Sequence, residues 1–178
     1  MTRLSRQALL GAGSAIALVG LPLMTQFVEA AQTADPSDIA SLNSAIAIER
    51  AGIKAYTDAA ATGLLSKPVL AVASGFLADH IGHRDALIAA VRVAGATPTT
   101  DTLKLTYPPL KSQADILRFA LVVEEKAANT YLSEIPDFKD RRFAELAASI
   151  LGVETTHVAL LSNALGQPTP YPGGFMPT

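Results

Sequence analysis

The chain has 178 residues, a formal net charge of −2 and no cysteine. This length suits one domain with its own buried core. The missing cysteines exclude disulfides and thiolate metal sites, and the near-neutral charge provides no basic surface, so we expect no nucleic-acid partner.

Residues 1–30 have the composition of an export signal. Arg3 and Arg6 precede an uncharged apolar run, which ends in small residues at the −3 and −1 positions of a cleavage site. The stretch resembles a twin-arginine signal in which Ser5 replaces the first arginine, so the Sec and twin-arginine routes both stay open. We expect a periplasmic or exported protein. If the segment is not cleaved, residues 8–28 are long enough to anchor the chain to the membrane.

The remaining chain divides into a helical domain over residues 31–166 and a tail over 167–178 that is too rich in proline and glycine to be helical. Asp35, followed by proline and acid, predicts the first helix start, and Ser112 with Asp115 predicts the capping box of the third. Apolar residues at helical spacing, with glycine and proline at the ends, predict four helices. They cover about residues 36–61, 68–93, 112–135 and 139–165.

A long connection separates the second predicted helix from the third. Residues 96–111 contain three prolines and many threonines, which favours an extended chain. Sixteen extended residues can reach roughly 50 Å, whereas a helix of 26 residues is roughly 39 Å long. The connection can therefore run the full length of the helices and make the second and third helices parallel. This predicts an all-α fold, a four-helix bundle with one long crossover.

The two halves of the helical domain repeat one pattern. A glutamate precedes a tyrosine by seven residues on one helix, and a histidine follows another potential ligand by three residues on the next. The members are Glu49, Tyr56, His80 and His83 in the first half, and Glu124, Tyr131, Glu154 and His157 in the second. Positions three apart share a helical face, so both side chains can reach one interior point. Carboxylate and imidazole together suit Fe and Mn, and also Zn.

The tyrosines share a helical face with the glutamates, because positions seven apart also lie on one side of a helix. A buried tyrosine hydroxyl needs a hydrogen-bond partner. We therefore expect Tyr56 and Tyr131 to point inward and to bond a ligand carboxylate or histidine.

Over residues 36–166 this pattern resembles the ferritin-like superfamily, which has a glutamate on the first and third helices and Glu-x-x-His on the second and fourth. With the export signal, it looks like the exported ferritin-like and desiccation-related branch. The resemblance implies two Fe ions, with Mn or Zn as alternatives. It implies six metal ligands, namely Glu49, His80, His83, Glu124, Glu154 and His157. Tyr56, Tyr131 and Asp79 would support them, and Glu124 is preferred to Glu125 because Tyr131 then keeps the same offset.

One ligand departs from the family pattern, because His80 stands where a glutamate is expected. Three carboxylates then face two divalent ions instead of four. A bridging hydroxide or Asp79 could supply the missing charge. Alternatively, a single ion binds near Glu49, Glu124, Glu154 and His157. In a third outcome the second-helix site is dead, and His80 and His83 only hydrogen-bond to the glutamates.

The resemblance implies an exported metal-binding oxidoreductase that acts on peroxide or dioxygen under oxidative or desiccation stress. No catalytic residue is assigned beyond the metal ligands. The alternative is a non-catalytic ferritin-like subunit of the cell envelope with a degenerate or absent metal site. A homo-oligomer or a larger assembly is compatible with either function.

Overall fold

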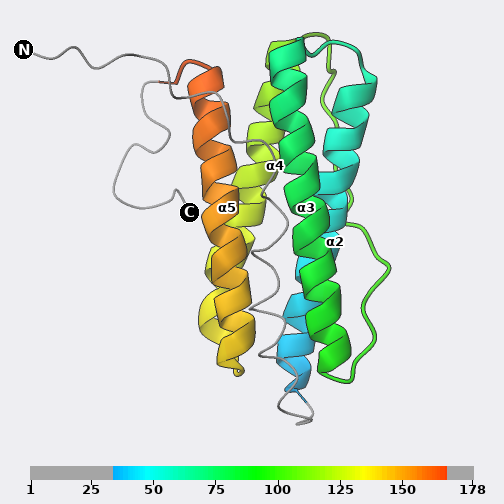
Figure 1. The fold of residues 1–178 in the computed structure, drawn as a ribbon, viewed down its shortest axis with the longest axis vertical. Helices are drawn as coiled ribbons and strands as arrows, with labels where there is room; N and C mark the ends of the chain where they lie inside the picture. The colour runs from blue at the N-terminus through cyan, green and yellow to red at the C-terminus, as the bar shows by residue number, and fades with distance from the viewer. Residues whose placement is uncertain (1–33, 168–178) are drawn as a thin grey trace, which may run out of the picture.

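A computed structural model describes residues 34–167, which form a bundle of four long helices (Figure 1). The helices are α2 (Pro36–Ala61), α3 (Lys67–Val93), α4 (Gln113–Glu134) and α5 (Arg141–Ala164), with a short 3₁₀ turn η2 (Ile135–Asp137) before α5. The predicted all-α fold is confirmed. The predicted export signal and nearly all of the predicted tail lie outside the described residues.

The helix starts follow the capping signals in the sequence. The Asp35 carboxylate accepts a hydrogen bond from the Ser37 backbone N–H at 2.8 Å at the start of α2. The Ser112 hydroxyl accepts one from the Asp115 N–H at 3.2 Å at the start of α4. Each of these side chains satisfies an N–H that has no partner within the helix.

The turn between α4 and α5 differs slightly from the prediction. α4 ends at Glu134, and the chain tightens into η2 around Pro136, whose ring nitrogen cannot donate a helical hydrogen bond. α5 begins at Arg141, two residues later than predicted, because the Asp140 carboxylate caps the helix by accepting from the Arg142 N–H at 2.9 Å. Both differences are within the usual uncertainty of a helix boundary.

The long crossover runs along the outside of the bundle, as predicted. It leaves the end of α3, follows α2 and returns to the start of α4, so α3 and α4 run parallel (Figure 1). The Leu103 N–H donates to the Ala47 carbonyl at 3.0 Å, and the Thr99 N–H donates to the Asn43 side chain at 2.7 Å. These two bonds attach the connection to α2. Among the helices, α2 packs mainly against α3, and α4 packs mainly against α5.

The core consists of two main apolar layers with a polar level between them. One layer includes Leu42, Leu87 and Ile150, and the other includes Phe76 and Val158. On each helix the acidic and imidazole residues of the repeat fall between the members of these two layers. The buried charges are therefore enclosed by apolar side chains above and below.

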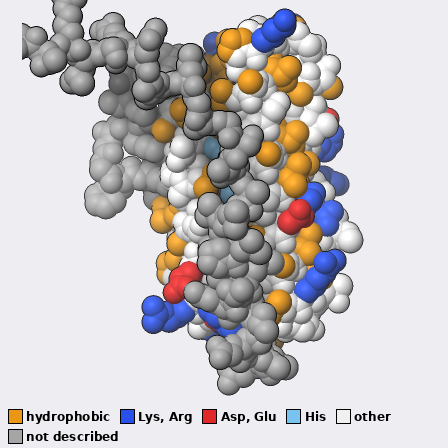
Figure 2. All heavy atoms as spheres, in the orientation of Figure 1, with side chains coloured by type: hydrophobic (Ala, Val, Ile, Leu, Met, Phe, Trp, Pro, Cys, Tyr) orange, Lys and Arg blue, Asp and Glu red, His pale blue; other side chains and the backbone are white. Residues whose placement is uncertain are grey.

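Apolar residues lie on the surface of α3 and make up much of α5. Figure 2 shows hydrophobic side chains along the exposed face of α3, where Val72, Ile81 and Val93 are partly open to solvent. Within residues 34–167, only α5 is long and apolar enough to cross a membrane. Several of its apolar residues, such as Phe143, Ile150 and Val158, pack in the bundle core, and it carries the buried Glu154 and His157.

Candidate metal centre

The six predicted ligands lie together inside the bundle. They are Glu49 on α2, His80 and His83 on α3, Glu124 on α4, and Glu154 and His157 on α5. Five are at most 2% exposed, and the His83 side chain is 13% exposed. They form two groups that share His80 and Glu154, and the ligand atoms of each group lie within 4.8 Å of one another. Their role as metal ligands remains a prediction.

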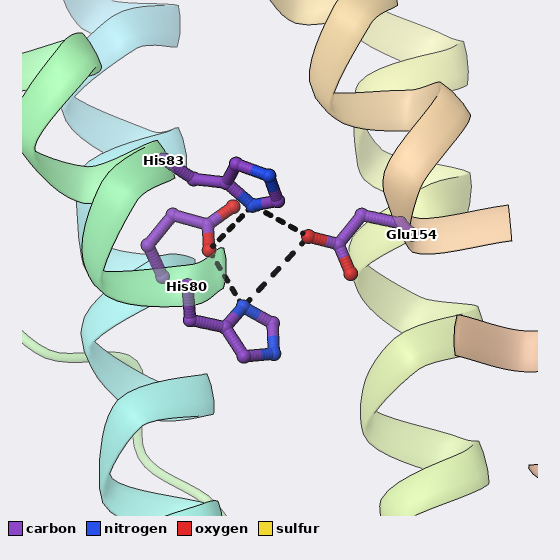
Figure 3. Close-up of side chains that lie close together, drawn as sticks. His80, His83 and Glu154 are labelled. Atoms are coloured by element: carbon purple, nitrogen blue, oxygen red, sulfur yellow. Dashed lines mark hydrogen bonds and ion pairs between the residues drawn. The ribbon is translucent and has the colours of Figure 1, made fainter. Parts of the chain in front are cut away.

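The first group consists of Glu49, His80, His83 and Glu154. His80 Nδ1 lies 2.7 Å from Glu49 Oε2, and His83 Nδ1 lies 3.0 Å from Glu154 Oε1. Figure 3 shows the two histidines of α3 and Glu154 of α5 pointing toward one another. Two carboxylates and two imidazoles thus converge on one interior point.

The second group consists of His80, Glu124, Glu154 and His157. His157 Nδ1 lies 3.2 Å from Glu124 Oε2 and 3.5 Å from Glu154 Oε2. His80 Nε2 lies 3.3 Å from Glu124 Oε1, so the two nitrogens of this ring face different groups. Glu154 is shared in the same way, because its Oε1 contacts the histidines of α3 and its Oε2 contacts His157.

The two tyrosines of the repeat hold the glutamates of the opposite hairpin. The Tyr131 hydroxyl on α4 donates to Glu49 Oε1 on α2 at 2.5 Å. The Tyr56 hydroxyl on α2 donates to Glu124 Oε1 on α4. This exchange follows the two-fold symmetry of the repeat, and it orients one carboxylate of each group.

Asp79 lies beside the cluster and belongs to neither group. Its Oδ2 is 3.1 Å from His157 Nε2, and its side chain is 46% exposed. It therefore links His157 to solvent. The structure does not place it where it would replace the carboxylate that His80 displaces.

The comparisons with known proteins agree with this architecture. The model of the ferritin-like domain family matches residues 37–167. The chain belongs to the ferritin-like domain family. A solved structure similar to this ferritin-like chain is that of a conserved hypothetical protein, rv2844, from Mycobacterium tuberculosis, with a TM-score of 0.66 and 23% identity. The match covers 78% of this chain and 96% of that protein, and it supports the fold alone. No curated protein sequence matches significantly.

Two residues beside the ferritin-like cluster were not predicted from the sequence. A Cβ atom at Gly52 would lie 2.8 Å from His80 Cε1 and 2.9 Å from each of its ring nitrogens, so glycine makes room for the ring. The Phe76 ring stacks on the His157 ring with centroids 3.8 Å apart. The signal for Gly52 is an isolated glycine inside a helical pattern, three residues after a ligand glutamate. Phe76 gives no such signal, because its spacing also fits ordinary core packing.

The carboxylates of the ferritin-like cluster hold protons on the histidines. Burial lowers the pKa of His83 and of His157, but the neighbouring glutamates outweigh it and raise each pKa to about 9. The pKa of His80 is raised as well, because Glu124 and Glu49 outweigh its burial. Burial raises the pKa of Glu124, but His157 and His80 reverse this effect and hold it well below its usual range. Without metal, the cluster is therefore a network of imidazolium and carboxylate groups.

The stability of the metal-free protein should depend on pH. Raised pKa values make the three histidines stabilise the fold below about pH 6.5, and the contribution of His83 and His157 is lost as pH rises through about 9. Glu49 and Glu124 have lowered pKa values, so their contribution is present above about pH 4.5 and is lost in acid. We expect the urea midpoint of chelator-treated protein to fall between pH 6.5 and 9. A midpoint that stays constant over this range would contradict the protonated network.

The arrangement of the side chains at this ferritin-like site is consistent with a metal site. Within residues 34–167, neither oxygen of the buried Glu154 makes a hydrogen bond of good geometry, although its Oε1 lies 3.0 Å from His83 Nδ1 and its Oε2 lies 3.5 Å from His157 Nδ1. The equally buried Asp38 accepts from the Lys139 and Asp140 N–H groups at 2.8 and 2.9 Å. A buried carboxylate normally has such partners, because leaving it without them is costly. Glu154 has only ion-pair contacts with imidazoles in place of such hydrogen bonds, which is consistent with a metal ligand.

Proposed function

We propose that this ferritin-like protein binds two divalent ions, iron or manganese, and is an oxidoreductase acting on peroxide or dioxygen. The observation that carries this proposal is the buried Glu154, whose two oxygens make no hydrogen bond of good geometry among the described residues and lie beside different imidazoles, Oε1 beside His83 and Oε2 beside His157. Oxygen and nitrogen ligands of this kind suit both metals.

Each ion would have its own set of residues and two shared ones. Glu49 and His83 would hold the first ion, and Glu124 and His157 would hold the second. His80 and Glu154, which belong to both groups, would contribute to both ions. When bound, two ferrous ions would supply the two electrons that reduce one peroxide to water. The apolar layers above and below the cluster keep bulk water away from it.

The chain's own residues would orient the ligands and move protons. The Tyr131 and Tyr56 hydroxyls hold Glu49 and Glu124 in place by hydrogen bonds. The histidines must lose protons before they can bind a cation, because a ligating imidazole is neutral. Asp79, with its Oδ2 at His157 Nε2 and half of its side chain in solvent, provides a route for such a proton.

We further propose that the protein acts outside the cytoplasm, in protection against oxidative or desiccation stress. The support is the sequence of residues 1–30, with Arg3 and Arg6 before an apolar run. If that segment is retained, the same bundle would be anchored to the membrane.

A second candidate function, a non-catalytic envelope protein, is supported by the histidines. Three imidazolium groups and three carboxylates balance in charge, and His80 contacts both Glu49 and Glu124. A cluster of this kind could hold the bundle together without any metal.

Metal content and iron oxidation separate the two candidates. Protein purified from its native compartment should contain about two Fe or Mn per chain. Chelator-treated protein that is reloaded anaerobically with Fe(II) should then oxidise it, on exposure to peroxide or air, faster than buffer does. His157→Ala should abolish this activity, whereas Glu145→Gln, at an exposed position of the same helix, should keep it. Protein that contains no metal, and whose stability is unaffected by chelators, would support the non-catalytic function instead.

A further inference from the structure

An apolar pocket lies at one end of the bundle, next to the candidate metal centre. Its volume is about 220 Å³, and residues from all four helices line it, including Ala59, Pro68, Ile116 and Ala164. These residues come from the end of α2, the starts of α3 and α4 and the end of α5, which meet at the upper end in Figure 1.

The walls of the pocket are hydrocarbon. Apart from Tyr56, every described residue that lines it is alanine, valine, leucine, isoleucine, proline or phenylalanine. The Tyr56 hydroxyl is already bonded to the Glu124 carboxylate. A charged ligand would have no partner in the pocket, and burying it there would be unfavourable. The pocket therefore selects an uncharged ligand.

The floor of the pocket is in contact with the candidate metal centre. Phe76 lines the pocket and stacks on His157 with ring centroids 3.8 Å apart. Tyr56 meets Phe76 edge to face with centroids 5.8 Å apart, and its hydroxyl reaches Glu124. A single layer of two aromatic rings thus separates a bound molecule from the cluster.

We propose that this pocket binds a small uncharged molecule with a compact hydrocarbon body, an aromatic or short acyl group larger than benzene. A dry cavity of about 150 Å³ with similar walls binds benzene, so 220 Å³ leaves room for a larger group. The mouth is accessible, because Val72 and Leu160 on its wall are 50% and 48% exposed. Binding requires no metal, so it is independent of the proposed oxidoreductase function.

Two fluorescent probes with the same aromatic body test the proposal. N-phenyl-1-naphthylamine is uncharged, and 8-anilinonaphthalene-1-sulfonate adds one negative charge. The full chain, both chelator-treated and metal-loaded, should bind the uncharged probe at one saturable site and the anionic probe at least tenfold more weakly. Equal binding of the two probes, or no saturable binding of the uncharged one, would overturn the proposal.

Matched variants locate the site on the protein. Ala73 lines the pocket and packs beside Tyr56 and Phe76. Because the larger side chain of Ala73→Leu fills part of the pocket, this variant should weaken binding of the uncharged probe at least tenfold. Ala71→Leu, at an exposed position of the same helix that does not line the pocket, should leave binding unchanged. Ala164→Leu, at the end of α5, is a second filling variant if Ala73→Leu fails to fold. Equal affinities of the filling and control variants would refute the assignment.

Two further results would show that something other than a small molecule occupies the pocket. If Phe175→Ser in the full chain strengthens probe binding tenfold, the chain's own C-terminal residues compete for the pocket. If the probe dissociates as protein concentration rises, together with a shift to a larger sedimenting species, a second copy covers it. Either result would overturn the proposal of a small-molecule ligand.

Discussion

Glu154→Gln should make the metal-free protein more stable and abolish its metal binding. Burial raises the pKa of Glu154, and the neighbouring Glu124 raises it further, against the opposing effect of His157 and His83. An acid whose pKa is higher in the folded state than in the unfolded state carries a charge that opposes folding at neutral pH. Glutamine keeps the shape and removes this charge, so we expect the free energy of unfolding to increase.

The same substitution should remove a ligand from both metal positions. Glu154 is shared between the two groups, and its two oxygens contact different histidines. Loss of a residue that only supports a ligand typically costs 10- to 100-fold in affinity, so loss of a shared ligand should cost about 100-fold or more. Calorimetric titration with Mn²⁺ measures this effect, and urea unfolding of chelator-treated protein measures the gain in stability.

Glu145→Gln is the matched control, because it makes the same chemical change at an exposed position of α5. This control should change neither the affinity for Mn²⁺ nor the free energy of unfolding beyond experimental error. If Glu154→Gln destabilises the metal-free chain, the ion pairs of this carboxylate with His83 and His157 outweigh the cost of burying its charge. The site would then be a structural network, and the main support for metal binding would be lost.

The fold could be predicted from the sequence because its signals are local. Helix periodicity, the Asp35 and Ser112 caps and the length of the 96–111 connection each depend on neighbouring residues, and all agreed with the bundle that the structure shows. The start of α5 was wrong by two residues. Asp140 competes as a cap there, and the choice depends on the backbone of the preceding turn.

The site could be predicted only in part, because its contacts depend on how the two hairpins meet. Seven-residue spacing shows that Tyr56 and Tyr131 face inward, but it does not show that each bonds the glutamate of the other hairpin. The stacking of Phe76 on His157 also joins α3 to α5. Such pairs require the register between helices, which no local pattern in a single sequence contains.

The repeat contains one further difference, which becomes meaningful only in the structure. Gly52 follows Glu49 by three residues, and Ala127 follows Glu124 by three. The half with glycine carries the larger imidazole of His80, and the half with alanine carries Glu154 at the matching position. Glycine and histidine therefore appear as a matched pair, because the missing methyl group provides the space for the ring.

Gly52→Ala should consequently destabilise the protein, although alanine is the better helix former. The new Cβ would lie 2.8 Å from His80 Cε1, a distance at which something must shift. His80 cannot shift freely, because it is buried, its Nδ1 lies 2.7 Å from Glu49, and the Tyr56 ring lies 5.5 Å away. Overpacking typically costs about 1–3 kcal/mol, against a helix-propensity gain of about 1 kcal/mol, so we expect a net loss of up to about 2 kcal/mol in the free energy of unfolding, measured with urea.

Two controls separate the clash with His80 from other effects of the Gly52 substitution. Gly82→Ala on α3 has no neighbouring atom within 4 Å of the new Cβ, so it should stabilise the helix by about 0.5–1 kcal/mol. In a His80→Ala background the clash is absent, and Gly52→Ala should then be neutral or stabilising, which a double-mutant cycle measures as coupling. Weakened Mn²⁺ binding by Gly52→Ala is also expected, because His80 belongs to both groups. If Gly52→Ala stabilises the protein as much as Gly82→Ala does, His80 has room to move, and a ring held in a fixed position between two ions is excluded.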